Sequence, residues 1–393
     1  MMNLLRTVTN TFVRKSTICP ARSTSTLSIT VPLSLRKRSE PQHRYEPGGY
    51  HSVIGKLGWG QYSTVWLVQD THNEKLVAMK ILVGDMDIPD KKGDWDELGI
   101  LKILRDTNPQ SPGYHHVCRL LDDFTLKGPN GNHTCLVLEA MGLSVLDVYH
   151  VLRGPMPLPL LKRVSKHLLS ALSYLHDECG IIHTDIKGDN ILMTGKPLEE
   201  GQADLELDEE YLMSTEFKLS DFGAANKMSN RFAQMIQPES LRAPEVIIGA
   251  EWDTKADIWN LGCIIYEFAR GTKLFDPHWD NENSGMNPPQ MHLSQIEGLC
   301  GAFPTDFLRR GKKSELYFDD QGQHHLLYSF SCSLLKGAGR YSITIEDLLS
   351  RAGHSPEENS EIADFLYFML IINPKERLSA SLLLEHPWLS NVE

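Results

Sequence analysis

Apolar positions along the chain change their period near residue 141. Before that point, short apolar runs such as residues 76–79 lie between polar turns, which is typical of strands. Within this part, residues 94–105 alone carry apolar side chains at helical spacing. After it, long apolar faces at 160–175 and 257–270 follow the helical period. The pattern predicts an α+β chain, with a small, mostly β N-terminal part carrying one helix and a large, mostly α C-terminal part.

Five motifs interrupt this pattern. H-T-D-I-K-G-D-N at 183–190 follows the long predicted helix, and D-F-G begins at Asp221, behind a predicted strand at 217–220. A-P-E stands at 243–245, V-A-M-K ends at Lys80, and a glycine pair lies upstream between two apolar runs. The glycine pair alone would indicate only a hairpin turn. Together, in this order and spacing, the motifs match the protein-kinase signature and predict one bilobal domain.

Phosphoryl transfer requires positioning and charge neutralisation more than covalent catalysis. Asp185 is predicted to orient the attacking hydroxyl and take its proton, and Lys187 to neutralise the γ-phosphate. Asn190 and Asp221 offer oxygen ligands, the type that Mg²⁺ prefers. The motifs therefore predict ATP and Mg²⁺ as cofactors.

Lys80 ends its predicted strand and would bring a positive charge to the α- and β-phosphates. Such a lysine needs an acid to hold it, and Glu97 on the following helix is the preferred partner. Asp96 is the alternative, but adjacent helical residues point about 100° apart. The sequence thus predicts a Lys80–Glu97 ion pair.

Nucleotide contacts are predicted from both parts of the domain. Gly58 and Gly60 would let backbone amides approach phosphate oxygens that a β-carbon would block. An extended linker at 136–142 would offer main-chain groups of Glu139 and Met141 to adenine, with Leu138 behind them. The predicted set also includes Leu57, Ser63, Val65, Ala78 and Leu192.

Several polar positions are better explained as structural. His183 is predicted to be packed, because Asp185 already fills the role of base. Asp257 is expected to cap its helix and to hold the catalytic loop, residues 183–190. Glu245 and Arg377 are expected to form a buried ion pair.

Composition agrees with a soluble enzyme of 393 residues. Seven cysteines are scattered without a C-x-x-C pair, which favours reduced thiols in an intracellular protein over a zinc site or a disulfide framework. No apolar run reaches the roughly 18 residues that a membrane span needs. We therefore expect no membrane helix.

Charge is unevenly distributed along the chain. Residues 1–39 carry seven Lys or Arg and no acid, whereas the remainder carries 32 Lys or Arg against 51 Asp or Glu, a net charge of −19. An acidic body favours basic partners and argues against direct nucleic-acid binding. The basic, Ser/Thr/Arg-rich segment at 1–45 is predicted to be either a disordered tail or a mitochondrial transit peptide.

The domain is predicted to divide into an N-lobe at 46–140 and a C-lobe at 141–393, with an insert at about 272–345. The segment 197–216 holds eight acids and no Lys or Arg, so it cannot be core; it is either a solvated loop or a contact for basic substrates. Further candidate acidic contacts lie at 276–282 and 315–320. A monomer is expected.

Narrower strings resemble one kinase family. G-G-Y-H from Gly48, K-L-G-W-G at 56–60, L-L-D-D-F at 120–124 and L-R-R-G-K-K-S-E-L-Y-F-D-D-Q-G at 308–322 resemble the serine/arginine-rich protein-specific kinases, in particular their fungal branch. The resemblance implies a Ser/Thr kinase of the CMGC group that uses ATP and Mg²⁺ and phosphorylates serines in Arg/Ser-rich proteins such as splicing factors. It also implies a location in cytoplasm and nucleus, the mitochondrion being the alternative from the basic tail.

Thr184 replaces the arginine that commonly holds an activation-loop phosphate in other kinases. Because threonine has no charge to offer, the loop at 224–239 is predicted to be ordered by packing alone and the enzyme to be constitutively active. The rival interpretation is a pseudokinase scaffold for Arg/Ser-rich partners, suggested by the short segment between His51 and Ile54. The presence of Lys80, Glu97, Asp185, Asn190 and Asp221 favours the enzyme.

Overall fold

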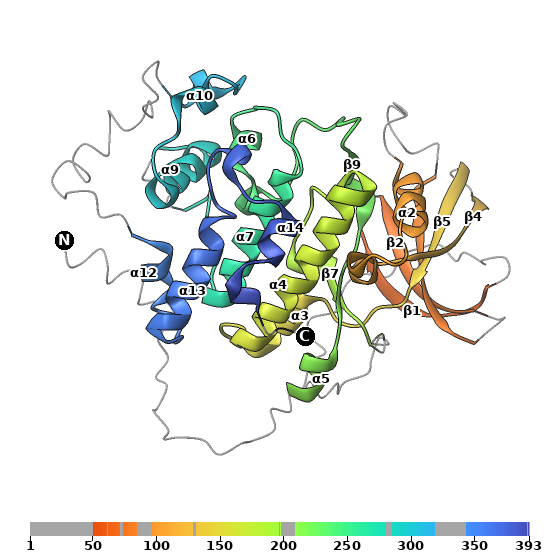
Figure 1. Cartoon of the computed structure of the whole chain (residues 1–393). Coiled ribbons are helices and arrows are strands. Elements are labelled where there is room, and N and C mark those ends of the chain that lie inside the picture. The colour runs from red at the N-terminus through yellow and green to blue at the C-terminus, as the bar shows by residue number, and fades with distance from the viewer. Residues whose placement is uncertain are drawn as a thin grey trace.

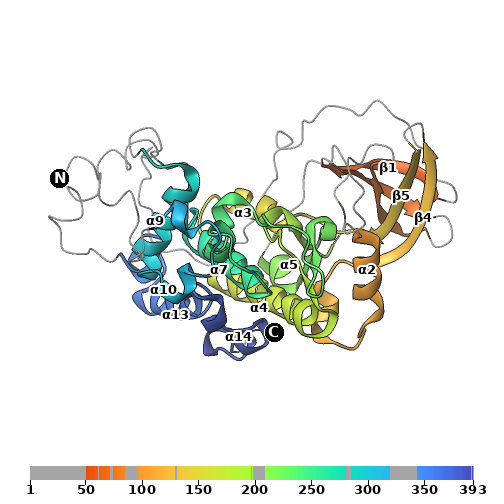
Figure 2. The ribbon, with the colours of Figure 1, turned by 90° about the horizontal axis from the view of Figure 1, so that it is seen from above.

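The computed structural model describes residues 50–60, 62–70, 74–84, 96–128, 131–195, 197, 209–279, 285–318, 343–390 and 392. They form a small β-sheet lobe and a larger helical lobe, which lie side by side in both views (Figure 1, Figure 2). The predicted α+β bilobal fold is confirmed. The tail at 1–45, most of the acidic segment (198–208) and 319–342 of the insert lie outside the described residues.

The N-terminal lobe is built on an antiparallel sheet. Among the described residues its strands are β1 (Tyr50–Trp59), β2 (Ser63–Asp70), β3 (Leu76–Leu82), β4 (Leu120–Gly128) and β5 (Gly131–Glu139), in the order β1-β2-β3-β5-β4. The short segment after His51 still forms β1, whose pairing with β2 shifts register at three places. Lys80 lies on the buried strand β3, opposite Val65 of β2 and Leu136 of β5.

Helix α2 (Glu97–Asp106) packs against this sheet and buries Ile100, Leu101 and Leu104. The predicted helix at 94–105 began too early. Asp96 is the N-cap residue, and its carboxylate accepts a hydrogen bond from the Gly99 amide at 2.7 Å. This cap satisfies one of the free amides of the first turn, so that α2 begins at Glu97.

The C-terminal lobe is mostly helical. Its longer helices are α3 (Val145–Leu152), α4 (Leu158–Ser173), α7 (Lys255–Arg270), α9 (Pro288–Cys300) and α13 (Pro356–Tyr367), and its short ones are α5 (Glu209–Ser214), α6 (Pro244–Ile247), α10 (Thr305–Leu308), α12 (Ile345–Leu349) and α14 (Ala380–Leu384). Two small antiparallel pairs join β6 (Ile181–Ile182) to β9 (Asn226–Lys227) and β7 (Ile191–Met193) to β8 (Phe217–Leu219). These pairs carry the polar motifs to the face of the lobe that meets the sheet.

Helix α7 runs through the core of this lobe, and nearly all its side chains are buried. The expectation that Asp257 caps it was wrong, because the helix begins at Lys255 with Thr254 at the N-cap position. Asp257 therefore lies within the first turn, where a carboxylate also faces the positive end of the helix dipole. The other expectation for this residue, contact with the catalytic loop, is confirmed below.

The described end of the acidic segment is not a loop. Residues 209–214 form α5, which lies against α4 (Figure 1). Leu212 is buried while Glu210 is exposed, so the short helix separates apolar from acidic side chains. The helix can therefore bury an apolar side chain while its carboxylates stay in solvent.

Glu245 and Arg377 form a bidentate ion pair in the core of the C-terminal lobe, as expected. The guanidinium nitrogens lie 2.6 and 2.7 Å from the carboxylate oxygens, and both side chains are fully buried. The guanidinium also donates to the carbonyls of Ile372 and Lys255 and stacks over Trp259. The arginine is therefore held in place by partners that do not depend on Glu245.

Replacing Glu245 by Gln should lower the free energy of unfolding by about 3–5 kcal/mol, because the buried guanidinium loses its counter-charge. Urea unfolding measures this change. Asp306→Asn is the control, since Asp306 pairs with Arg309 on the surface and such pairs contribute at most about 1 kcal/mol. Equal effects of the two substitutions would show that burial does not set the strength of the Glu245 pair.

Candidate active site

Lys80 is held between two carboxylates at the meeting of the lobes. Its ammonium nitrogen lies 2.6 Å from Glu97 Oε1 and 2.8 Å from Asp221 Oδ1. Burial by itself lowers the pKa of Lys80, but the two carboxylates outweigh burial and raise the pKa above its ordinary value. The lysine is thus a fixed positive charge, and Glu97, not Asp96, is the acid on α2 that holds it.

Asp185 lies in the loop after β6, within a second polar cluster. Lys187 Nζ donates to its Oδ2 at 2.8 Å, and Asn190 Nδ2 donates to the same oxygen at 3.1 Å and to the Asp185 carbonyl at 2.8 Å. Both the amide and the hydroxyl of Ser220 donate to the Asn190 carbonyl. Ser220 directly precedes Asp221, so these bonds join the two clusters into one site.

Side chains of α7 hold the backbone of this loop through hydrogen bonds. The fully buried Asp257 carboxylate accepts hydrogen bonds from the amides of His183 and Thr184 at 2.8 and 2.9 Å, and it contacts His176 Nε2 at 2.9 Å. Asn260, one turn further along α7, donates to the Ile186 carbonyl at 2.8 Å. Sequence reasoning missed Asn260, although polar residues three apart on an otherwise apolar helix were a visible signal.

His183 is packed, as predicted. Its side chain is fully buried, its Nε2 lies 3.0 Å from the Ser220 carbonyl, and its ring packs edge-on against Phe222. His183 therefore supports the segment that carries Asp221 instead of facing the reacting groups.

The backbone of the site is strained at three side-chain-bearing positions. Thr184, Asp221 and Gln237 have φ values of 67°, 60° and 70°, in the left-handed region. Such conformations cost about 1–3 kcal/mol each and persist where surrounding contacts hold them. Here those contacts are hydrogen bonds between the catalytic loop and the segments after Asp221 and before A-P-E. Gln237 had not been singled out from the sequence.

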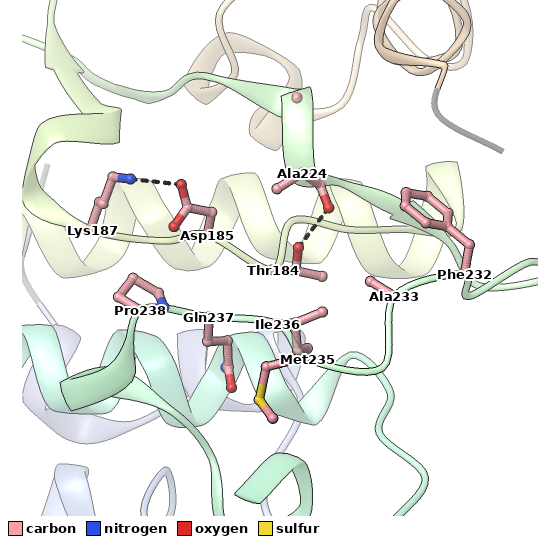
Figure 3. A pocket seen from close by; sticks show the side chains of 11 residues that line it. Thr184, Asp185, Lys187, Ala224, Phe232, Ala233, Met235, Ile236, Gln237 and Pro238 are labelled. Carbon is pink, nitrogen blue, oxygen red and sulfur yellow. Dashed lines mark hydrogen bonds and ion pairs between the residues drawn. The ribbon is translucent and has the colours of Figure 1, made fainter. Parts of the chain in front are cut away.

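A cavity of about 410 Å³ opens beside Asp185 (Figure 3). Asp185 and Lys187 lie at one side, and Phe232, Met235, Ile236 and Pro238 form an apolar wall opposite them. Phe232 and Met235 are partly exposed at its margin. The cavity is therefore an apolar recess next to the group that would receive the hydroxyl proton.

The predicted nucleotide residues lie on strands of the N-terminal sheet, on the linker after β5 and on β7 of the C-terminal lobe. Leu57 and Gly58 end β1, Ser63 and Val65 begin β2, and Ala78 lies on β3 opposite Leu138. Glu139 ends β5 and Met141 follows it, while Leu192 lies on β7 in the other lobe. A β-carbon at Gly58 or Gly60 would meet no protein atom within 4 Å, so the fold itself does not require glycine there.

The oxygens of the site suit a divalent cation bound together with a phosphate ligand. Asp221 has a half-exposed side chain, and Asn190 turns its amide nitrogen towards Asp185, which directs its oxygen away. Within the described residues no group of three His, Cys, Asp or Glu side chains could hold a metal. Mg²⁺ typically binds in this way, through one or two protein oxygens plus substrate phosphates.

No helix of the described part has the length and apolarity to cross a bilayer.

Comparisons with known proteins agree with this geometry. Residues 51–389 match the family model of the protein kinase domain. The serine/threonine-protein kinase SRPK of Physarum polycephalum is 31% identical over 88% of this chain and 90% of its own, and the human SRSF protein kinase 3 is 24% identical over 94% and 95%. A serine/threonine protein kinase of Aspergillus fumigatus is 32% identical over 86% and 84%.

A solved kinase-domain crystal structure superposes with a TM-score of 0.69 at 23% identity, covering 91% of this chain and all of its own, and it supports the fold. A protein kinase domain uses ATP and a divalent cation. The chain belongs to the serine/arginine-rich protein-specific kinase family and is a serine/threonine protein kinase.

Proposed function

We propose that this kinase transfers the γ-phosphate of Mg²⁺-ATP to serines in Arg/Ser-rich proteins such as splicing factors, in cytoplasm and nucleus. The observation that carries the proposal is the joining of the two charged clusters, around Lys80 and around Asp185, through Ser220 and Asn190. One cluster suits the nucleotide phosphates, and the other suits the hydroxyl that attacks them.

Each residue then has a separate task. Lys80, fixed by Glu97, would neutralise the α- and β-phosphates, while Asp221 and Asn190 would hold Mg²⁺, which offsets the charge that develops on the phosphates. Asp185 would accept the proton of the serine hydroxyl and orient its oxygen in line with the γ-phosphate. Lys187, 2.8 Å from Asp185, would stabilise the phosphoryl group during transfer. The positions and charges of these residues support the proposal.

The choice of Arg/Ser-rich substrates rests on the family and on charge. The human relative is named for SRSF proteins as its targets, and the chain outside residues 1–39 carries a net charge of −19. Guanidinium groups bind carboxylates in a bidentate fork that ammonium groups cannot match. In the described part of the predicted acidic segments, Asp276, Glu315 and Glu210 are exposed. They are candidate contacts for substrate arginines.

A peptide of Arg-Ser repeats should be phosphorylated with a kcat/KM well above that of the matched Lys-Ser peptide. Charge alone would predict equal kcat/KM values for the two peptides. The reason is the lost bidentate geometry, since both peptides carry the same charge. Raising the salt concentration should weaken both, because exposed charges are screened over a Debye length of about 8–10 Å. Equal efficiency for the two peptides would overturn the substrate assignment and leave the kinase chemistry intact.

We further propose that the enzyme is constitutively active. Thr184 Oγ1 donates to the Ala224 carbonyl at 2.7 Å, and the Thr184 carbonyl accepts from the Gln237 amide at 3.0 Å. The Gln237 side chain in turn donates to the Ala256 carbonyl at 2.7 Å and accepts from the Ala243 amide at 2.9 Å. These bonds between uncharged groups contact both ends of the loop at 224–239, and they support the proposal because none of them needs a phosphate.

Phosphatase treatment of the purified protein should therefore leave its peptide kinase activity unchanged, within about twofold. The physical reason is that no arginine at position 184 awaits a phosphate. Gln237→Ala is the companion variant, and it should lose activity because it releases the segment from α7. A large loss after phosphatase treatment, restored by rephosphorylation, would contradict constitutive activity.

A further inference from the structure

The largely buried carboxylate of Glu139 joins the two lobes. Glu139 accepts hydrogen bonds from Lys218 Nζ at 3.0 Å to Oε1 and 2.9 Å to Oε2. Arg119 adds its backbone amide at 2.9 Å and its guanidinium at 3.2 and 3.4 Å. The Lys218 side chain is only 6% exposed and that of Glu139 15%, so the pair is shielded from solvent.

These three residues come from three different elements. Glu139 is the last residue of β5 and opens the linker between the lobes, and Arg119 precedes β4. Lys218 lies in the middle of β8 in the C-terminal lobe, paired with Leu192 of β7. The cluster, here called the linker clamp, therefore ties the linker to the β7–β8 strand pair, which carries Leu192, one of the predicted nucleotide residues.

Strand β8 also leads directly to Asp221. Ser220, between them, is bonded to Asn190, so a displacement of β8 would move both predicted metal ligands. On the other side, the Glu139 amide donates to the Arg119 carbonyl at 3.2 Å, and Val77 of β3 pairs with Glu139. The linker clamp is thus the point where the linker, the floor strands and the approach to Asp221 are fixed relative to one another.

Stability alone is a poor explanation for such a cluster. Burying charges costs desolvation free energy, and apolar residues of similar size are often equally stabilising. What a charged pair with several directional bonds supplies is one defined geometry. The main chain of Glu139 is also predicted to face adenine. Because only a short side chain connects the carboxylate to the main chain, fixing the carboxylate also restrains the main chain.

We propose that Lys218, with Arg119, is a positioning residue for the nucleotide, holding Glu139 so that the linker and the strand leading to Asp221 keep the spacing that the nucleotide needs. The inference concerns nucleotide binding and does not depend on the identity of the protein substrate. Lys218 does not contact the predicted phosphate or metal groups, and it acts through Glu139.

The test measures ADP affinity by calorimetry without added metal, together with KM for ATP and KM for an Arg-Ser peptide. Lys218→Met should weaken ADP binding and raise KM for ATP by about tenfold or more, the loss expected for a hydrogen bond to a charged group. KM for the peptide should stay within about twofold. Lys218→Arg, which keeps the charge and the donors, should restore most of the affinity. Lys162→Met is the control, since Lys162 pairs with Glu361 elsewhere in the C-terminal lobe.

The double variant Lys218→Met with Glu139→Gln separates positioning from folding. It leaves no unpaired buried ion, so it should fold even where the single variant does not, yet it should still bind ADP about tenfold more weakly than the parent. Parent-like ADP affinity in the folded double variant would overturn the proposal, as would an equal rise in both KM values. Because ADP binding needs no phosphate transfer, these results stand whether or not the peptide is a substrate.

Discussion

Replacing Asp185 by Asn should lower kcat for peptide phosphorylation by about 10² to 10⁴ while nucleotide affinity stays close to that of the parent. The substitution keeps the shape of the side chain but removes the carboxylate that would take the hydroxyl proton, and a positioned general base contributes a rate factor of that size. The loop should keep its fold, because it is fastened by backbone bonds to Asp257 and Asn260 that do not involve the Asp185 side chain.

Asp189→Asn is the matched control for this experiment. Asp189 lies in the same loop but is exposed to solvent, so its loss should leave kcat nearly unchanged. The measurement is steady-state kinetics with an Arg-Ser peptide, together with nucleotide binding by calorimetry. Comparable turnover in the Asp185 variant and the parent would remove Asp185 from the role of base.

Lys80→Met should abolish detectable transfer, and Glu97→Gln should weaken it by a smaller factor. Methionine keeps the length of the side chain but removes the charge shared with Glu97 and Asp221, whereas glutamine can still accept a bond from Lys80 without the ionic attraction. Turnover and KM for ATP would be measured for both variants.

Asp96→Asn tests the register of α2 within the same series. Asp96 caps the helix instead of holding Lys80, and asparagine is an equally good cap, so activity should change little. If Asp96→Asn proves more harmful than Glu97→Gln, the assignment of the lysine partner fails.

Sequence patterns predicted best what is local or carried by a motif. The strand holding Lys80, the long helices and the buried Glu245–Arg377 pair follow from apolar spacing and recognisable strings. The choice of Glu97 over Asp96 as the partner of Lys80 followed because neighbouring residues on a helix point about 100° apart. The strand and the helices are set by a few adjacent residues, whereas the Glu245–Arg377 pair, 132 positions apart, was predicted because each partner stands in a recognisable motif.

Contacts between distant residues that no recognisable motif links were not predictable in this way. Glu139 and Lys218 are 79 positions apart, and nothing in the pattern around either indicates that they meet. The Gln237 network likewise needs the fold to bring it to Thr184 and α7. The predicted starts of two helices were also shifted by two or three residues. Helix α2 begins later than predicted because Asp96 caps it, and α7 begins earlier, at Lys255.

The central claim is that the cleft transfers phosphate and does not merely bind nucleotide. The most direct test is γ-phosphate incorporation by the purified protein into an Arg-Ser repeat peptide, beside an acidic-site peptide and with the Asp185→Asn variant in parallel. We predict rapid incorporation into the Arg-Ser peptide, much less into the acidic-site peptide, and almost none with the variant. Nucleotide binding without incorporation into either peptide would contradict the claim and favour a pseudokinase scaffold.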